Sequence, residues 1–182
     1  TDAEIVSIFQ KLNKLDLTVL KWKQGKRHAR SVLGLTRFTS TTATSTWAFL
    51  AGSLDARITL SVNKVVLFHG ARLLGSPHPG CQNTVEFTIK NEAVTISMAV
   101  TGTFTSQVDV NGMWGYDVML PKPIALLPNE NFELKAKIEG TASYNYGQNV
   151  PLSVTVDDIV VQLTNSANRT HDIFSKIYLS KL

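Results

Sequence analysis

The sequence predicts an all-β protein, an antiparallel β-sandwich preceded by a short amphipathic helix. Apolar and polar residues alternate over short runs, which is typical of strands with one buried face. Turn residues such as Asn111-Gly112 and Pro128-Asn129 separate these runs. After about Leu33 the strand pattern continues throughout, and many short strands without intervening helices favour an antiparallel sandwich over a parallel sheet.

The helix is expected over residues 2–17. Its apolar residues follow the spacing of one helix face: Ile5, Ile8, Phe9, Leu12 and Leu15. Residues 1–31 hold seven basic and three acidic residues, a balance of 7 − 3 = +4 that equals the net charge of the chain, so the remainder is neutral. We therefore divide the chain into a helix with a basic linker (1–31) and a sandwich domain (32–182), and we do not expect nucleic-acid binding.

Eleven runs are expected to form strands. The β-branched residues that favour a pleated, half-buried surface crowd several of them. In chain order the runs are 33–39, 45–51, 56–63, 65–74, 83–90, 92–101, 115–120, 131–139, 142–146, 151–164 and 172–180.

The segment 54–76 is the most informative part of the chain. Its first half alternates apolar with polar residues at Ile58, Leu60 and Val62. An almost unbroken apolar run from Val65 to Phe68 follows, and Gly70 closes it. This pattern predicts a half-exposed strand, a tight turn, and then a strand buried on both faces.

This segment resembles the signature of the PHR domain, in which Leu-Asp-Ala-x-Ile-x-Leu-Ser-Val-Asn-Lys precedes an apolar strand and Gly-Ala-Arg-Leu-Leu-Gly-Ser. Further segments match family elements in the same order, over roughly residues 35–165. They are Thr36 to Ser40, Trp47 to Phe49, Gly52, Pro123 to Asn129 and Ser143 to Gly147. The resemblance implies an antiparallel sandwich of about a dozen strands.

PHR domains occur in the giant Pam/Highwire ubiquitin ligases and in BTB-domain adaptors of ubiquitin ligases. The resemblance implies a non-catalytic module that recruits a substrate or regulator through loops at one end of the sandwich. In the Pam/Highwire branch it also implies a neuronal role in axon growth and synapse development. The chain departs from the adaptor-like pattern at Leu73-Leu74, and Ile173 to Tyr178 only loosely echo the family's closing strand. Both branches stay open.

The cellular setting is expected to be the cytoplasm, with an axonal or synaptic location in the neuronal branch. The single cysteine, Cys81, forms no internal disulfide, which favours a reducing compartment. No apolar run is long enough to span a bilayer. Because the chain starts with Thr1, we expect it to be a piece of a larger protein.

Motifs for catalysis or metal binding are missing from the sequence, so we expect neither an enzyme nor a cofactor. The four histidines and Cys81 lack zinc-ligand spacing, and no serine lies in a Gly-x-Ser-x-Gly motif. His69 is interpreted as a hydrogen-bonded residue of a buried strand, and His78 as a loop residue that is solvated or touches a partner. Asp157-Asp158 is interpreted as a turn between strands.

Three loops combine glycine with aromatic residues, the residue types of adaptable contact surfaces: 75–81, 108–115 and 144–148. For Trp114 and Tyr116, core and surface positions are equally open. The domain is expected to be monomeric and to bind a protein of the ubiquitin pathway or a ligase substrate. The predicted contact residues are Arg72, Ser76, His78, Met113, Trp114, Tyr144, Tyr146 and Gln148.

Two other classes of function are alternatives. A glycan-binding sandwich would use Trp114, Tyr144 and Tyr146 as stacking platforms. An esterase-like hydrolase would need a serine activated by residues distant in sequence.

Overall fold

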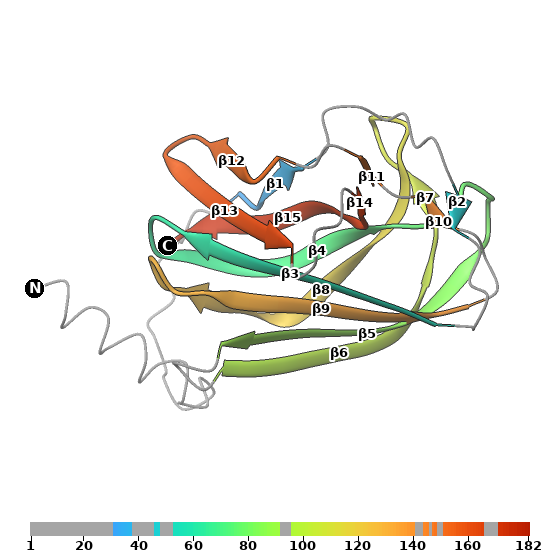
Figure 1. Cartoon of the computed structure of the whole chain (residues 1–182), viewed down its shortest axis with the longest axis horizontal. Helices are drawn as coiled ribbons and strands as arrows, with labels where there is room; N and C mark the ends of the chain where they lie inside the picture. The colour runs from blue at the N-terminus through green and yellow to red at the C-terminus, as the bar shows by residue number, and fades with distance from the viewer. Residues whose placement is uncertain are drawn as a thin grey trace, which may run out of the picture.

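A computed structural model describes residues 31–37, 46–47, 53–91, 96–140, 144–145, 147–148, 151–165 and 171–182. Within these ranges the regular structure is β-strand throughout, which confirms the predicted all-β class. Two large antiparallel sheets pack face to face as a sandwich (Figure 1). The predicted helix of residues 2–17 lies outside the described residues.

The first large sheet has five strands. In spatial order they are β1 (Leu33–Thr36), β15 (Phe174–Lys181), β4 (Val66–Leu74), β8 (Trp114–Leu126) and β7 (Gln107–Val108). The second large sheet has six strands. In spatial order they are β12 (Ser153–Val156), β13 (Ile159–Asn165), β3 (Ser53–Val62), β9 (Phe132–Glu139), β5 (Gln82–Asn91) and β6 (Ile96–Thr105).

Two short pairs complete the topology. β10 (Tyr144–Asn145) pairs with β2 (Thr46–Trp47), and β11 (Gly147–Gln148) pairs with β14 (His171–Asp172). In Figure 1, β10, β2 and β7 all lie at the right-hand end of the sandwich.

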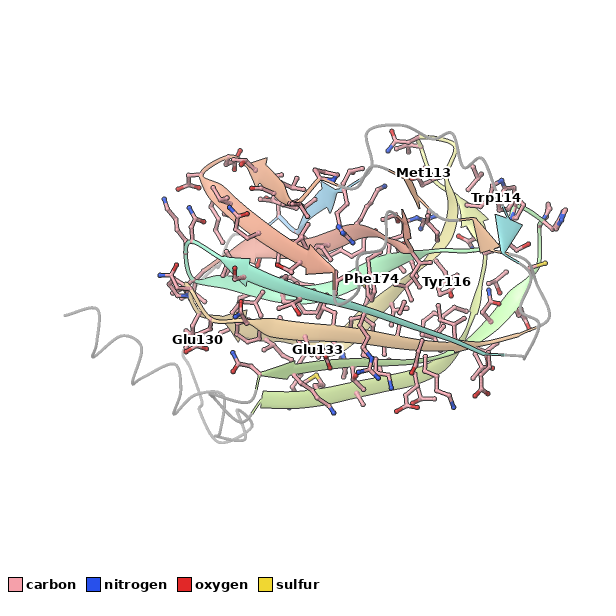
Figure 2. All side chains as sticks on the ribbon, viewed as in Figure 1. Met113, Trp114, Tyr116, Glu130, Glu133 and Phe174 are labelled. Atoms are coloured by element: carbon pink, nitrogen blue, oxygen red, sulfur yellow. The ribbon has the colours of Figure 1, made fainter. Side chains whose placement is uncertain are left out.

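The core forms where the inner faces of the two large sheets meet. Alternate residues of β5 are fully buried, and the same period buries Phe132, Leu134, Ala136 and Ile138 of β9. Phe87 of β5 contacts Phe68 of β4 and Phe174 of β15, with ring centroids 6.3 and 6.5 Å apart (Figure 2 labels Phe174). Each such buried apolar side chain contributes about 1.5–3 kcal/mol relative to an exposed one. This aromatic cluster holds the two sheets together.

β4 confirms the predicted strand with two buried faces, since every residue from Ala71 to Leu74 is buried. The backbone of β4 requires a glycine at position 70. Gly70 has φ of +152°, and a Cβ there would lie 2.3 Å from the carbonyl oxygen of Val118. The register between β4 and β8 shifts at this point, from Gly70 opposite Met119 to Phe68 opposite Ile124.

β8 is longer than the predicted 115–120, because it continues past two prolines to Leu126. Pro121 and Pro123 lie in the stretch between Met119 and Ile124, where the register shift leaves β8 without directly opposed residues on β4. A proline lacks the N–H that a sheet hydrogen bond needs, so such an irregularity tolerates it.

The predicted strand 151–164 is wrong as one element, because it is a hairpin of two strands. The turn Asp157-Asp158 separates β12 from β13, and Asp157 has a positive φ of 54°. The interpretation of this acidic pair as a turn is therefore confirmed.

The last strand, β15, pairs on both edges. It lies between β1 and β4, with Leu179 opposite both Leu33 and Phe68. Most of the loosely matching segment 173–178 therefore lies in an interior strand of the five-stranded sheet, next to the edge strand β1.

Candidate functional site

Two loops meet at the end of the sandwich where β4 ends and β8 begins. We call them the end loops: residues 75–81, after β4, and residues 106–113, around β7. Ser106 joins them, because its hydroxyl donates to the carbonyl of Ser76 at 2.8 Å and its backbone N–H donates to the carbonyl of Cys81 at 2.9 Å. The two loops therefore form one continuous surface.

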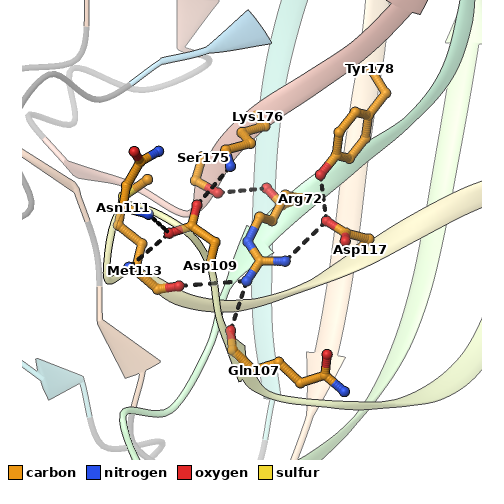
Figure 3. A network of polar contacts seen from close by, with 9 residues as sticks. All are labelled: Arg72, Gln107, Asp109, Asn111, Met113, Asp117, Ser175, Lys176 and Tyr178. Carbon is orange, nitrogen blue, oxygen red and sulfur yellow. Dashed lines mark hydrogen bonds and ion pairs between the residues drawn. The ribbon is translucent and has the colours of Figure 1, made fainter. Parts of the chain in front are cut away.

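The second end loop folds around the side chain of Asp109. One of its carboxylate oxygens accepts hydrogen bonds from the backbone N–H groups of Asn111 and Met113, both at 2.9 Å (Figure 3). Gly112 adopts the positive φ of 78° that closes the turn. A local carboxylate-to-backbone bond of this kind stabilises a tight turn.

Lys176, in β15, holds Asp109 from the sheet side. Its ammonium group lies 2.6 Å from the other carboxylate oxygen, and the side chains of Lys176 and Asp109 are only 14% and 8% exposed. Burial favours the neutral form of Asp109, but the hydrogen bonds from Lys176, Met113 and Asn111 outweigh it and lower the pKa of the carboxyl group. The loop is therefore tied to a core strand by a buried ion pair.

Arg72, in β4, holds the same loop from its other side. Its guanidinium donates to the carbonyl of Gln107 at 2.7 Å and pairs with the carboxylate of Asp117 at 3.1 Å. The phenol of Tyr178 donates to that carboxylate at 2.6 Å, and burial followed by this hydrogen bond raises the pKa of Tyr178. We call Arg72, Asp109, Asp117, Lys176 and Tyr178 the charge network (Figure 3).

The surface of the second end loop is apolar at its tip. Val110 is 96% exposed and Val108 is 55% exposed. The one charged side chain between them, Asp109, points inward to Lys176. The loop therefore presents uncharged side chains to the outside on a backbone that buried charges hold in place.

Five of the eight predicted contact residues lie at or beside the end loops. His78 is exposed and Trp114 is half-buried. Arg72, Ser76 and Met113 are buried in this chain: Arg72 and Met113 support the loop from within, and Ser76 contributes its carbonyl to Ser106. For these three the structure indicates a supporting position beneath the surface (Figure 2 labels Met113 and Trp114).

The other three predicted contacts fall where side chains are not described. The backbones of Tyr144 and Gln148 lie in β10 and β11, and Tyr146 lies outside the described residues. The glycan-binding alternative depends on the side chains of Tyr144 and Tyr146. Of its three stacking residues, only Trp114 has a described side chain, which is half-buried.

Sequence reasoning missed Val110 and the charge network. The loop itself was predicted, but its large side chains were favoured over the valine at its tip. The signal that could have found the turn is Asp109 followed by Asn111-Gly112, since Asp and Asn-Gly favour turns. The partners of Asp109 and Arg72 lie 67 and 45 residues away in sequence, so no local pattern reveals them.

The structure also bears on the predictions about His69, metal binding and membrane-spanning segments. Nε2 of His69 lies 2.9 Å from the hydroxyl of Ser180, as predicted for a hydrogen-bonded strand residue. Among the residues described here, no cluster of three His, Cys, Asp or Glu side chains is suited to hold a metal ion. None of the described segments is a helix of the length and hydropathy that crossing a membrane requires.

Comparison with known protein families gives a match to the PHR domain over residues 36–171. The chain belongs to the PHR domain family. A search of curated proteins found no match. The matched region of this PHR domain includes both end loops, Arg72, Asp109 and Asp117, and it ends at β14. Lys176 and Tyr178 therefore complete the charge network from beyond the matched residues.

Proposed function

We propose that this PHR domain is a non-catalytic protein-interaction module of a ubiquitin-ligase assembly, and that it recruits a substrate or regulator through its end loops. The setting would be the cytoplasm of neurons, with a role in axon growth and synapse development. Ubiquitin transfer itself would be performed by other domains of the assembly.

The observation that carries the proposal is the position of Val110. This side chain is 96% exposed although the loop beneath it is fixed by the buried Asp109–Lys176 pair. A loop that is already ordered loses little conformational entropy when it binds. An exposed apolar side chain on such a loop gains free energy by entering an apolar pocket of a partner.

The rim of this surface supports the same interpretation. His78 is exposed in the first end loop, and Trp114 is half-buried at the start of β8. Tryptophan is enriched at binding hot spots, and histidine and tryptophan both combine an apolar ring with a polar N–H. A protein surface with a shallow apolar pocket would match this arrangement.

The test is a substitution at the loop tip, Val110→Asp, in the 182-residue chain. Burying a valine is worth about 1.5 kcal/mol, so replacing it by a charged residue should weaken partner binding at least about tenfold. Proteins of the ubiquitin pathway captured from neuronal lysate would be quantified by mass spectrometry, and the strongest would be purified for a direct binding titration. The unfolding free energy should stay within about 0.5 kcal/mol of wild type.

Leu152→Asp is the matched control. Leu152 is 70% exposed but precedes β12, at the edge of the other sheet. It should leave the titration unchanged. Equal binding by wild type and Val110→Asp would contradict the proposal.

A further inference from the structure

The outer edge of β6 differs from the other edges of the sandwich. β1 and β12 have four residues each and β7 has two, whereas β6 has ten. β6 pairs with β5 on one side, and within the described part of the chain no strand pairs with its other side. Within the ranges that the structure describes, the outer edge of β6 is therefore a long row of backbone donors and acceptors without a strand beside it.

Proteins usually protect such an edge with charges, proline or a bulge. β6 has none of these: Ile96 to Thr105 contain no charged residue and no proline, and the register with β5 is unbroken. The neighbouring strands of the same sheet carry the charges instead, with Lys135 of β9 near Asp55 of β3, and Lys137 near Glu139. The charged side chains of this sheet therefore do not extend onto its edge strand, β6.

The inward face of β6 is incompletely covered. Met98, Val100 and Phe104 pack against the core but stay partly exposed. The ring of Phe104 stacks on Tyr116 of β8, with centroids 5.7 Å apart. A further strand beside β6 would cover these side chains if its own inward residues were apolar.

β6 itself has the composition that such a strand needs. We propose that the occupant of this edge is β6 of a second copy of this chain, paired antiparallel about a twofold axis at Gly102. In this register Val100 lies opposite Phe104 of the partner copy, and Thr101 lies opposite Thr103. Aromatic with β-branched pairs and threonine pairs are among the cross-strand pairs that stabilise sheets.

Gly102 suits the position on the axis. A Cβ there would lie 3.2 Å from the Phe104 ring of its own chain, so a side chain would compete with that ring for space. With glycine at this position, the Phe104 ring of each chain keeps its place beside the paired strands. The paired copies form one continuous sheet of twelve strands.

The dimer should dissociate on dilution. Pairing through the edge of one strand is a small contact, whereas stable specific interfaces usually bury at least about 1,000 Å². The sequence alone led us to expect a monomer, because nothing in it reveals which strand lies at an edge.

Two double variants that differ at one position test the register. Both carry Thr101→Lys, which faces Glu86 of β5 within the same chain and so has a partner in the monomer. In T101K/T103K the predicted register puts like charges opposite each other twice. In T101K/T103E it puts opposite charges there twice.

Sedimentation velocity over a range of protein concentrations gives the dimer dissociation constant. We expect T101K/T103K to dimerise at least tenfold more weakly than wild type, and T101K/T103E at least as tightly as wild type. A wild-type chain that sediments as a monomer throughout the range, or two variants that behave alike, would overturn the inference. Circular dichroism confirms that each variant is folded.

Val110→Asp separates this inference from the proposed function, because its loop lies outside β6. It should dimerise like wild type while it binds the recruited protein at least about tenfold more weakly. The dimer and the proposed recruiting function can therefore be disproved independently of each other.

Discussion

Lysine–aspartate ion pairs lie at both ends of the sandwich, but they are exposed at one end and buried at the other. At the end away from the loops, Lys64 of the β3–β4 turn and Lys181 of β15 pair with Asp158 of the β12–β13 turn at 2.6 and 2.9 Å. All three side chains are more than half exposed. At the loop end, Lys176 and Asp109 are almost entirely buried.

The difference follows from the length of the connections. The turn at Asn63-Lys64 is short. The side-chain amide of Asn63 donates a hydrogen bond to the carbonyl of Asp158 and accepts one from the backbone N–H of Val160. Its ion pairs add little, because water and salt screen exposed charges. The end loops are longer, and the second of them folds around the Asp109 carboxylate, so a charge lies inside the loop and is paired there with Lys176. Water and salt screen a buried ion pair less, but removing one partner leaves the other as an unpaired buried charge, which is strongly destabilising.

The largest effect should come from Lys176→Met, which removes the cation from the loop end. Asp109 would stay buried without its partner, and we expect a loss of about 3 kcal/mol of unfolding free energy. Urea denaturation followed by tryptophan fluorescence measures it. A loss as small as that of a surface substitution would show that the loop end does not depend on this pair.

A smaller effect should appear in the acid dependence of stability. The folded-state pKa of Asp109 lies below its ordinary value of 3.8, so its carboxylate stabilises the fold above that pH. This contribution is lost as the pH falls through 3.8 and then through the lower folded-state pKa.

The variant that isolates this contribution is Asp109→Asn. It should be less stable than wild type at neutral pH, and the difference should shrink as the pH falls below 3.8. High salt screens the exposed pairs of Asp158, whose pKa is also lowered, first by its hydrogen bond with Lys64. Urea denaturation at several pH values in high salt therefore reports on the loop end. A difference that stays constant with pH would contradict the buried pair as its source.

The smallest effect should come from Lys64→Met, the matched substitution at the turn end. Since Lys64 and Asp158 are both exposed, the denaturation midpoint should stay within experimental error of wild type, at low and at high salt. A loss comparable to that of Lys176→Met would remove the contrast between the two ends.

The sequence predicted what depends on local pattern and missed what depends on distant contacts. Alternation at Ile58, Leu60 and Val62 identified β3, and the apolar run after it identified β4. The acidic pair Asp157-Asp158 was correctly interpreted as a turn, but the predicted strand 151–164 ran across it, because β-branched residues flank the turn on both sides. The predicted β8 was also too short. The strand continues through Pro121 and Pro123 where its register with β4 shifts, and that shift depends on a distant strand.

The candidate site was predicted only in part for the same reason. Glycine and aromatic residues located the loops, but exposure depends on the folded chain. Ser76 and Val110 both lie in loops, yet Ser76 is fully buried and Val110 is almost fully exposed. The PHR resemblance identified the family, and only the three-dimensional arrangement separates supporting from exposed residues in the predicted loops.

The position of β15 has a consequence for how the protein is made. β15 leaves the ribosome after the other described strands of the domain, yet β1 and β4 each need it as a neighbour. Until it arrives, β4 can pair only with β8, and β1 has no place in its sheet. The six-stranded sheet, whose strands all precede residue 166, can assemble earlier during synthesis. Completion of the domain therefore waits for contacts between residues about a hundred positions apart, and such long-range pairing makes folding slow.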